Sequence, residues 1–233
     1  MKTIETFNGS TANNFEQYAW ELAGAYKIAF AGDPWNERSR CDAMTCEKGF
    51  CELTAGAPCP TCGSQLIEAY DENELVEGWL TMLKDEGAFM EVAMQNDIAY
   101  LATLVRPTTT QELYERKYSD VPQMQDWIKN TLPNGDFIWI EDTFANRDVQ
   151  PNKNLVDRGA TLGRIALQYG GLQIATRTLS PAVIAATVRD AGPVTSLYLG
   201  EEEIKMKKGL QVESSGTVPD ARSFLKIDGM KLI

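Results

Sequence analysis

All five cysteines of this chain lie between Cys41 and Cys62, and the chain contains no histidine. The last pair sits in a Cys-x-x-Cys-Gly sequence, which is typical of a thiolate knuckle whose backbone amides point at the sulfurs. Four thiolates form the tetrahedral set of soft ligands that Zn²⁺ prefers. We predict a structural zinc site at Cys41, Cys46, Cys59 and Cys62, with Cys51 either left over or taking the place of Cys46.

Disulfides would give the same clustering, but they are typical of small secreted chains in oxidising compartments. The odd number of cysteines leaves one thiol unpaired, and the opening residues Met1–Thr6 lack the apolar core of a signal peptide. A redox Cys-x-x-Cys pair would need a strand–helix context, whereas Pro60 and Thr61 lie between loops. We therefore favour zinc over disulfides or free thiols, and we expect a cytoplasmic protein.

The composition is that of a globular protein with a strong negative charge. The 233 residues are 43% hydrophobic, and the formal net charge is -11. This length suits one domain with an insertion, and no apolar run approaches the roughly 20 residues that span a bilayer. The charge argues against a nucleic-acid partner, because phosphate binding needs clustered Lys and Arg. It favours a cationic partner such as an amine, although acidity also simply keeps proteins soluble.

Hydrophobic periodicity and turn residues predict an alternation of helices and strands. We expect one or two short helices at 13–30, and further helices at 71–84, 110–130, from about 162 to 169, and at 180–191. We expect strands at 89–95, 98–105, 137–140, 172–178, 194–199 and 224–227. This order predicts a mixed α/β sandwich of the α+β class, formed by a single domain over 1–233 with a cysteine-rich module inserted at 33–66.

One segment before a predicted helix has the composition of an anion-binding loop. It reads Arg158-Gly159-Ala160-Thr161-Leu162-Gly163. Small residues let successive backbone N–H groups converge on an anion, and a helix N-terminus adds its partial positive charge. Glycines at the start of a helix are also ordinary turn residues, so the segment alone leaves both interpretations open.

This segment resembles the acyl-CoA-binding motif of the GNAT acyltransferases, an Arg or Gln, two residues, Gly, one residue, then Gly or Ala. Arg158 and Gly163 match the motif, and Thr161 stands where the first glycine is usual. The predicted strands at 89–105, 137–144 and 172–178 resemble that family's central meander and its fourth and fifth strands. Residues 34–70, including the cysteines, resemble prokaryotic and phage GNAT-like proteins that carry a zinc-knuckle insertion near the N-terminus.

The resemblance implies transfer of an acyl group, usually acetyl, from acetyl-CoA to a primary amine of a small molecule or peptide. The diphosphate would rest on the segment that begins at Arg158, whose members are Arg158, Gly159, Ala160, Thr161, Leu162 and Gly163, and Arg164 would pair with phosphate oxygens. The pantetheine arm would pair with the main chain from Ile140 to Thr143.

The resemblance also implies a base and an acid. Glu141 or Asp142 would accept the ammonium proton, and because strand side chains alternate, only one of them points inward; we prefer Glu141. Two solvated acids at a strand end are the alternative. The family often supplies an acid tyrosine from its last helix, but 180–191 contains none. Tyr198 on the next strand is our candidate, with ordinary packing as the alternative.

A non-enzymatic function remains as the second hypothesis. A catalytically inactive GNAT-like protein would act as a binding or inhibitor module through its zinc-knuckle surface. A zinc-ribbon nucleic-acid binder is disfavoured, because only Arg38, Arg40 and Lys48 add positive charge near the cysteines. Acetyl-CoA binding distinguishes the enzyme from the binding module. The sequence leaves a homodimer open and does not identify the acceptor.

Overall fold

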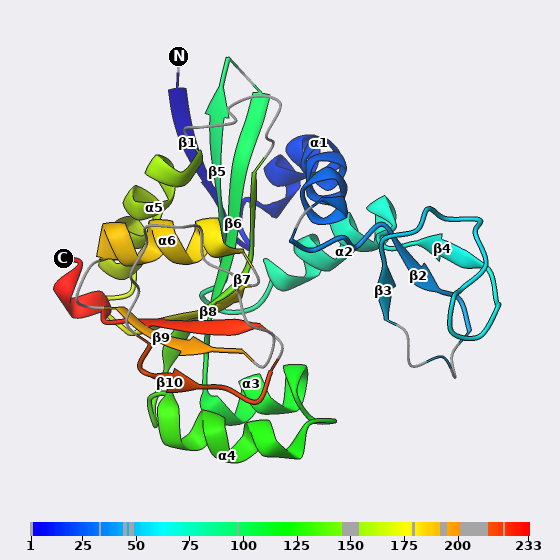
Figure 1. Cartoon of the computed structure of the whole chain (residues 1–233). Helices are drawn as coiled ribbons and strands as arrows, with labels where there is room; N and C mark the ends of the chain where they lie inside the picture. Colours follow the sequence, from blue (N-terminus) through cyan, green and yellow to red (C-terminus); the bar gives the residue numbers. More distant parts are fainter. Residues whose placement is uncertain are drawn as a thin grey trace. The chain divides into compact units, whose positions relative to one another are not determined.

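A computed structural model describes residues 2–32, 34–43, 46, 49–96, 98–145, 154–178, 180–191, 195–200, 214–220 and 222–233 (Figure 1). The backbone divides into two compact units, each built from discontinuous segments. Unit 1 consists of Met1–Asp85, Phe89–Ala102 and Thr143–Pro151. Unit 2 consists of Glu86–Ala88, Thr103–Asp142 and Asn152–Ile233.

Two helices and a strand pair form the core of unit 1. Helix α1 (Ala12–Ala31) packs against α2 (Glu72–Met82), with the Phe15 and Trp79 rings 6.3 Å apart. Asp71 caps α2 as predicted, because its carboxylate accepts the amides of residues 73 and 74 at 2.8 and 3.1 Å. Strand β1 (Lys2–Phe7) pairs antiparallel with β5 (Phe89–Gln95).

The cysteine-rich part of unit 1 contains its own small sheet. Strands β2 (Ser39–Cys41), β3 (Phe50–Cys51) and β4 (Leu66–Glu68) pair in the order β3-β2-β4, and both pairings are antiparallel (Figure 1). These strands are too short to bury a large apolar face, and their core is the cluster of Cys51, Cys59 and Leu66. A core of this size needs an additional staple to be stable.

The remaining elements belong wholly or partly to unit 2. Strands β6 (Ile98–Thr108) and β7 (Phe137–Ala145) contribute residues to both units. The helices are α3 (Thr110–Lys117), α4 (Pro122–Thr131), α5 (Asn154–Gln168) and α6 (Pro181–Ala191), with a final short turn η2 (Gly229–Lys231). The strands are β8 (Ile174–Thr178), β9 (Thr195–Leu199), β10 (Gly216–Thr217) and β11 (Ser223–Ile227).

The strands form one mixed sheet in the order β1-β5-β6-β7-β8-β11-β9-β10. In unit 2, β7 and β8 are parallel, whereas β11 is antiparallel to both β8 and β9. Residues of α3 and α4 pack on one face around Trp139 and Phe224. On the other face, Ile184 of α6 packs against Leu197 and Leu225. The predicted α+β class is confirmed.

The structure differs from the sequence prediction in several elements. The predicted helix at 110–130 is two helices, because Pro122 starts α4 at its first turn and disfavours helical backbone in the residue before it. The hairpin between β5 and β6 is confirmed, with Asn96 in a left-handed conformation at φ 53°. Strands β1 to β4 and β10 were not predicted. Among the described residues, no helix combines the length and the hydrophobicity that crossing a membrane requires.

Candidate functional site

The structure brings the four predicted zinc ligands together. The sulfurs of Cys41, Cys46, Cys59 and Cys62 all lie within 4.8 Å of one another. The Cys41–Cys62 and Cys46–Cys59 sulfur separations are 3.4 and 3.7 Å. A tetrahedral Zn²⁺ with bonds of 2.3 Å would place its sulfurs ~3.8 Å apart. The cluster therefore has the dimensions of a four-thiolate site, and Cys51, which is buried in β3, lies outside it.

The geometry of the last cysteine pair is that of the predicted knuckle. Gly63 has φ 78°, a conformation that favours glycine, and its amide donates to the Cys59 carbonyl at 2.8 Å. Hydrogen bonds from the Ser64 hydroxyl and amide lower the pKa of Cys62 to about 6. The amides of Cys62 and Thr61 lower the pKa of Cys59. The knuckle sulfurs therefore favour the thiolate form, which is the form that binds metals.

The pKa of Cys41 is shifted in the opposite direction, upward. The Ala43 amide lowers its pKa, but burial and the hydrogen bonds from neighbouring cysteine sulfurs outweigh this effect and raise the pKa to about 12. Several thiolates cannot easily be charged side by side without a cation between them. A bound Zn²⁺ would reverse this effect, since a metal ion deprotonates a coordinating thiol.

In unit 2, the parallel strands β7 and β8 diverge after two residue pairs. Their register joins Ile138 to Ile174 and Trp139 to Ala175, and it ends there, although both strands continue. On its other side β8 stays paired with β11 as far as Thr178. Two splayed parallel strands leave backbone N–H and C=O groups of β7 without a ladder partner on the β8 side.

The main chain of β7 is accessible at this divergence. Glu141 as a whole residue is half-buried, although its side chain is only 2% exposed. The accessible part of Glu141 is therefore its backbone. Ile140 is buried, and Asp142 and Thr143 are half-buried. The stretch that was predicted to pair with pantetheine thus includes open backbone at Glu141.

The Glu141 carboxylate lies among three cationic side chains. It contacts Arg106 Nε at 3.1 Å, Arg116 Nη2 at 2.6 Å and Lys117 Nζ at 2.8 Å. Arg106 comes from β6, and the other two come from the last turn of α3. The Arg116 contact is an ion pair whose angles do not satisfy a hydrogen bond. Its oxygens already contact three cations, so this carboxylate is poorly placed to accept a proton from the ammonium group of an amine.

Asp142 and Tyr198 are the other two predicted catalytic residues. Asp142 follows Glu141 in β7, so its side chain points to the opposite face of the sheet. Tyr198 lies on β9, which is separated from β7 by β8 and β11. Three strand spacings of ~4.8 Å, with β7 and β8 diverging beyond Trp139, put Tyr198 at least about 14 Å from Glu141. Its ring packs against Trp127 at 5.4 Å. The structure therefore does not bring Tyr198 and Glu141 together.

The predicted anion-binding loop is helical in the structure. Helix α5 begins at Asn154, so residues 158–163 lie inside it and not ahead of it. From the fifth residue of a helix onward, each amide donates to a carbonyl four residues earlier and does not face a ligand. Thr161 and Leu162 are also buried, at 2% and 3% exposure, and Arg164 Nη2 donates to Thr161 Oγ1 at 3.0 Å.

This corrects the predicted role of the amides of Gly159, Ala160, Thr161, Leu162 and Gly163, since these amides are used within the helix. The reason is that residues 154–168 share one amphipathic pattern, so a single helix forms that begins before Gly159 and continues through Gly163. Within α5, the amides without a helical carbonyl partner are those of 154–156. The side chain of Arg158 falls outside the described residues, as does the preceding segment 146–153.

Replacing Gly163 with alanine tests this correction. A Cβ at Gly163 would meet nothing within 4 Å, and alanine is favoured over glycine inside a helix by about 0.5–1 kcal/mol. We expect Gly163→Ala to raise the free energy of unfolding by that amount in a urea titration. A loss of stability, or a loss of acetyl-CoA affinity without a gain in stability, would instead restore the loop interpretation.

Sequence reasoning missed the cations around Glu141 and a second polar cluster. Arg177 Nη1 donates to Tyr118 Oη at 3.1 Å and to Asp220 Oδ2 at 3.4 Å, and burial raises the pKa of Tyr118. The adjacent basic residues Arg116 and Lys117 were visible in the sequence, within the helix predicted at 110–130. Nothing in the sequence assigned them to a glutamate more than twenty positions later.

Comparison with solved structures shows the fold of the chain. The polyamine N-acetyltransferase of Drosophila melanogaster matches 97% of this chain and 98% of its own, with a TM-score of 0.53 and 12% identity. An agmatine N-acetyltransferase variant matches with a TM-score of 0.49 and 13% identity, covering 96% and 97%. A GNAT-family acetyltransferase from Streptococcus pneumoniae matches with a TM-score of 0.44 and 9% identity, covering 97% of each chain.

The chain therefore has the mixed α+β fold of the GNAT acetyltransferases. No protein-family model matches the sequence. No curated protein matches it either. At these identities the likeness concerns the fold alone, and the predicted prokaryotic or phage type has no support.

Proposed function

We propose that the chain is an acyl-CoA-dependent N-acyltransferase that transfers acetyl from acetyl-CoA to a primary amine. The observation that supports this function best is the divergence of β7 from β8 beyond Trp139 and Ala175. An amide-containing chain can add to a strand edge by main-chain hydrogen bonds. The pantetheine arm of acetyl-CoA contains two amides, and the accessible backbone at Glu141 offers them such an edge.

The residues of unit 2 offer a better fit to the pantetheine arm of acetyl-CoA than to its diphosphate. The exposed main chain at Glu141 suits the pantetheine arm. For the diphosphate, the N-terminus of α5 supplies the amides of 154–156, which have no carbonyl partner within the helix, and the positive end of the helix dipole. This assignment replaces the amides of 159–163. Arg164, which already donates to Thr161, is a weaker phosphate ligand than predicted.

We assign the base to Asp142 and a positioning role to Glu141. The neutral amine attacks the thioester carbonyl carbon and forms the new C–N bond, the C–S bond breaks, and the departing thiolate takes the proton that the attacking nitrogen releases as the amide forms. Asp142 would accept the proton that the ammonium group loses before attack. A main-chain N–H of the open β7 stretch would stabilise the negative charge that develops on the carbonyl oxygen. Glu141, held by cations from β6 and α3, would fix that stretch in place.

We also propose that the module at 33–66 binds a structural Zn²⁺ through Cys41, Cys46, Cys59 and Cys62. The sulfur separations, the knuckle geometry and the absence of histidine from the chain support this ligand set. Zinc of this kind contributes folding energy and leaves no coordination position open for chemistry. The ion would provide the staple that the small core of β2, β3 and β4 needs.

Calorimetry with acetyl-CoA, together with Asp142→Asn, tests the proposed enzyme. We expect the unmodified protein to bind acetyl-CoA, and the variant to bind it with unchanged affinity. The variant should lose about 10²-fold in kcat, the usual contribution of a general base, and should lose the acidic limb of its pH–rate profile. An absence of binding at millimolar acetyl-CoA would refute the enzyme hypothesis. An unaltered pH profile would refute only the role of Asp142.

A further inference from the structure

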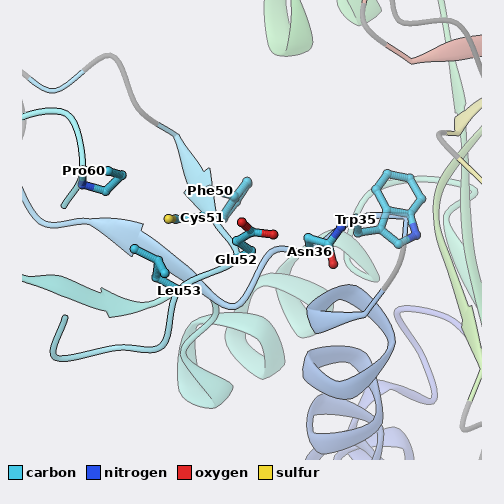
Figure 2. Close-up of a pocket in the computed structure, with 7 residues that line it drawn as sticks. All are labelled: Trp35, Asn36, Phe50, Cys51, Glu52, Leu53 and Pro60. Atoms are coloured by element: carbon cyan, nitrogen blue, oxygen red, sulfur yellow. The ribbon is translucent and has the colours of Figure 1, made fainter. Parts of the chain in front are cut away.

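The cysteine-rich module of unit 1 carries a hollow that the proposed transferase chemistry does not use. The hollow has a volume of about 370 Å³ and is lined by Trp35, Asn36, Phe50, Cys51, Glu52, Leu53 and Pro60. Figure 2 shows Trp35 and Pro60 at opposite ends, with Phe50 and Glu52 between them. The lining combines two aromatic rings, two apolar side chains and one carboxylate, and among the described residues it contains no cation.

The aromatic walls are held in place by neighbours from other elements. The Phe50 ring stacks on Tyr70 at 5.3 Å, and the Tyr70 hydroxyl donates to the buried carboxylate of Glu37. The Trp35 ring packs against Phe30 at 5.0 Å. The backbone next to Trp35 is fixed by Asn36, which has φ 52° and whose amide donates to the Gly32 carbonyl at 2.9 Å. These contacts position the rings before any ligand arrives.

The open side of the hollow is apolar and acidic. Phe50 and Leu53 are each 41% exposed, and Glu52 is also exposed. An aromatic face attracts a cation through its quadrupole, and a nearby carboxylate adds Coulombic attraction. The apolar residues would contact an aliphatic stem. An anion would meet the Glu52 carboxylate, the one charged group in the described lining, and the negative net charge of the chain, -11.

We propose that this hollow binds a lysine side chain presented by another polypeptide. The ammonium group would lie between the Glu52 carboxylate and the aromatic faces of Phe50 and Trp35. The four methylene groups of the lysine would cover Leu53 and Pro60. A lysine fits better than a bare ammonium ion, because a hollow that is half apolar and open to solvent gives a small hydrated cation little contact. The cysteine module is then a recognition module for basic segments.

Nuclear magnetic resonance of the intact, zinc-loaded chain tests this site with three probes. The first is the peptide acetyl-Ala-Lys-Ala-amide, the second is the same peptide with norleucine in place of lysine, and the third is methylammonium chloride. We expect the amide chemical shifts of Asn36, Phe50 and Glu52 to change, and the change to saturate as peptide is added, with the lysine peptide only. Equal shifts with the norleucine peptide would overturn the proposal, and so would saturation by methylammonium with the same affinity.

Charge variants with a matched control complete the test. Glu52→Gln should weaken binding of the lysine peptide about two- to fivefold, in line with exposed cation–π and ion-pair energies. Glu77→Gln removes the same charge from an exposed site on α2 and should leave the affinity unchanged. Phe50→Leu keeps an apolar side chain but removes the ring, and should weaken binding by a similar factor. Equal affinities for Glu52→Gln and Glu77→Gln would refute the site.

Discussion

Replacing Glu141 with glutamine should lower the free energy of unfolding by about 3 kcal/mol, the usual cost of removing one partner from a buried ion pair. The carboxylate is 2% exposed and faces three cations, whose side chains are 17%, 25% and 30% exposed. Without it, Arg106, Arg116 and Lys117 would repel one another with no counter-charge at the centre. For a chain of this size the loss corresponds to a fall in Tm of roughly 6–12 °C.

Thermal and urea unfolding of this variant needs two comparisons. Glu115→Gln removes the same charge from an exposed position of α3 and should change stability by less than about 0.5 kcal/mol. Glu141→Gln combined with Arg116→Met removes one cation as well, and should recover part of the loss. If Glu141→Gln kept its full stability and lost only turnover, with a changed pH–rate profile, Glu141 would be the base after all.

Replacing Cys59 with serine should abolish stoichiometric zinc binding and unfold the sheet of β2, β3 and β4. Cys59 is 3% exposed and belongs to both the sulfur cluster and the small apolar core. Structural zinc contributes about 10–16 kcal/mol of folding free energy in isolated zinc-finger peptides. The small core of Cys51, Cys59 and Leu66 is no comparable source of stability for the module. We expect one zinc per chain before the substitution, by elemental mass spectrometry, and much faster amide exchange in residues 39–68 after it.

The chain provides its own control in Cys51. This cysteine is also buried, but its sulfur lies outside the cluster, so Cys51→Ala should keep the zinc and lose only packing energy. Equal loss of zinc from both variants would contradict the assignment. So would less than half an equivalent of zinc in the carefully purified, unmodified protein.

The sequence predicted those parts of the site that depend on local spacing. The cysteine cluster follows from a tight turn at Gly63 and a second pair of cysteines upstream, and the structure brings the four predicted sulfurs together. The cap at Asp71 and the hairpin at Asn96 are also local. Each of these features is decided by interactions between residues a few positions apart.

The parts that failed depend on distant residues or on competing local patterns. Glu141 was interpreted as a solvated or catalytic acid, because its cations come from β6 and from the end of α3. Sequence spacing does not reveal such partners. The glycines at 159 and 163 indicated a loop, but the apolar periodicity of α5 continues through them, and tertiary packing of Leu162 and Ile165 outweighs the low helix propensity of glycine.

The discontinuity of the two units has a consequence for how the chain is made. Unit 1 combines residues 1–85 and 89–102 with a later segment that begins at Thr143, and residues 103–142 of unit 2 are encoded between them. A ribosome therefore releases most of the polypeptide before the N-terminal unit has all its parts. We expect neither half to fold when expressed as a continuous fragment, and we expect unit 1 to mature only after the segment from Thr143 has left the ribosome, with unit 2 completed later still.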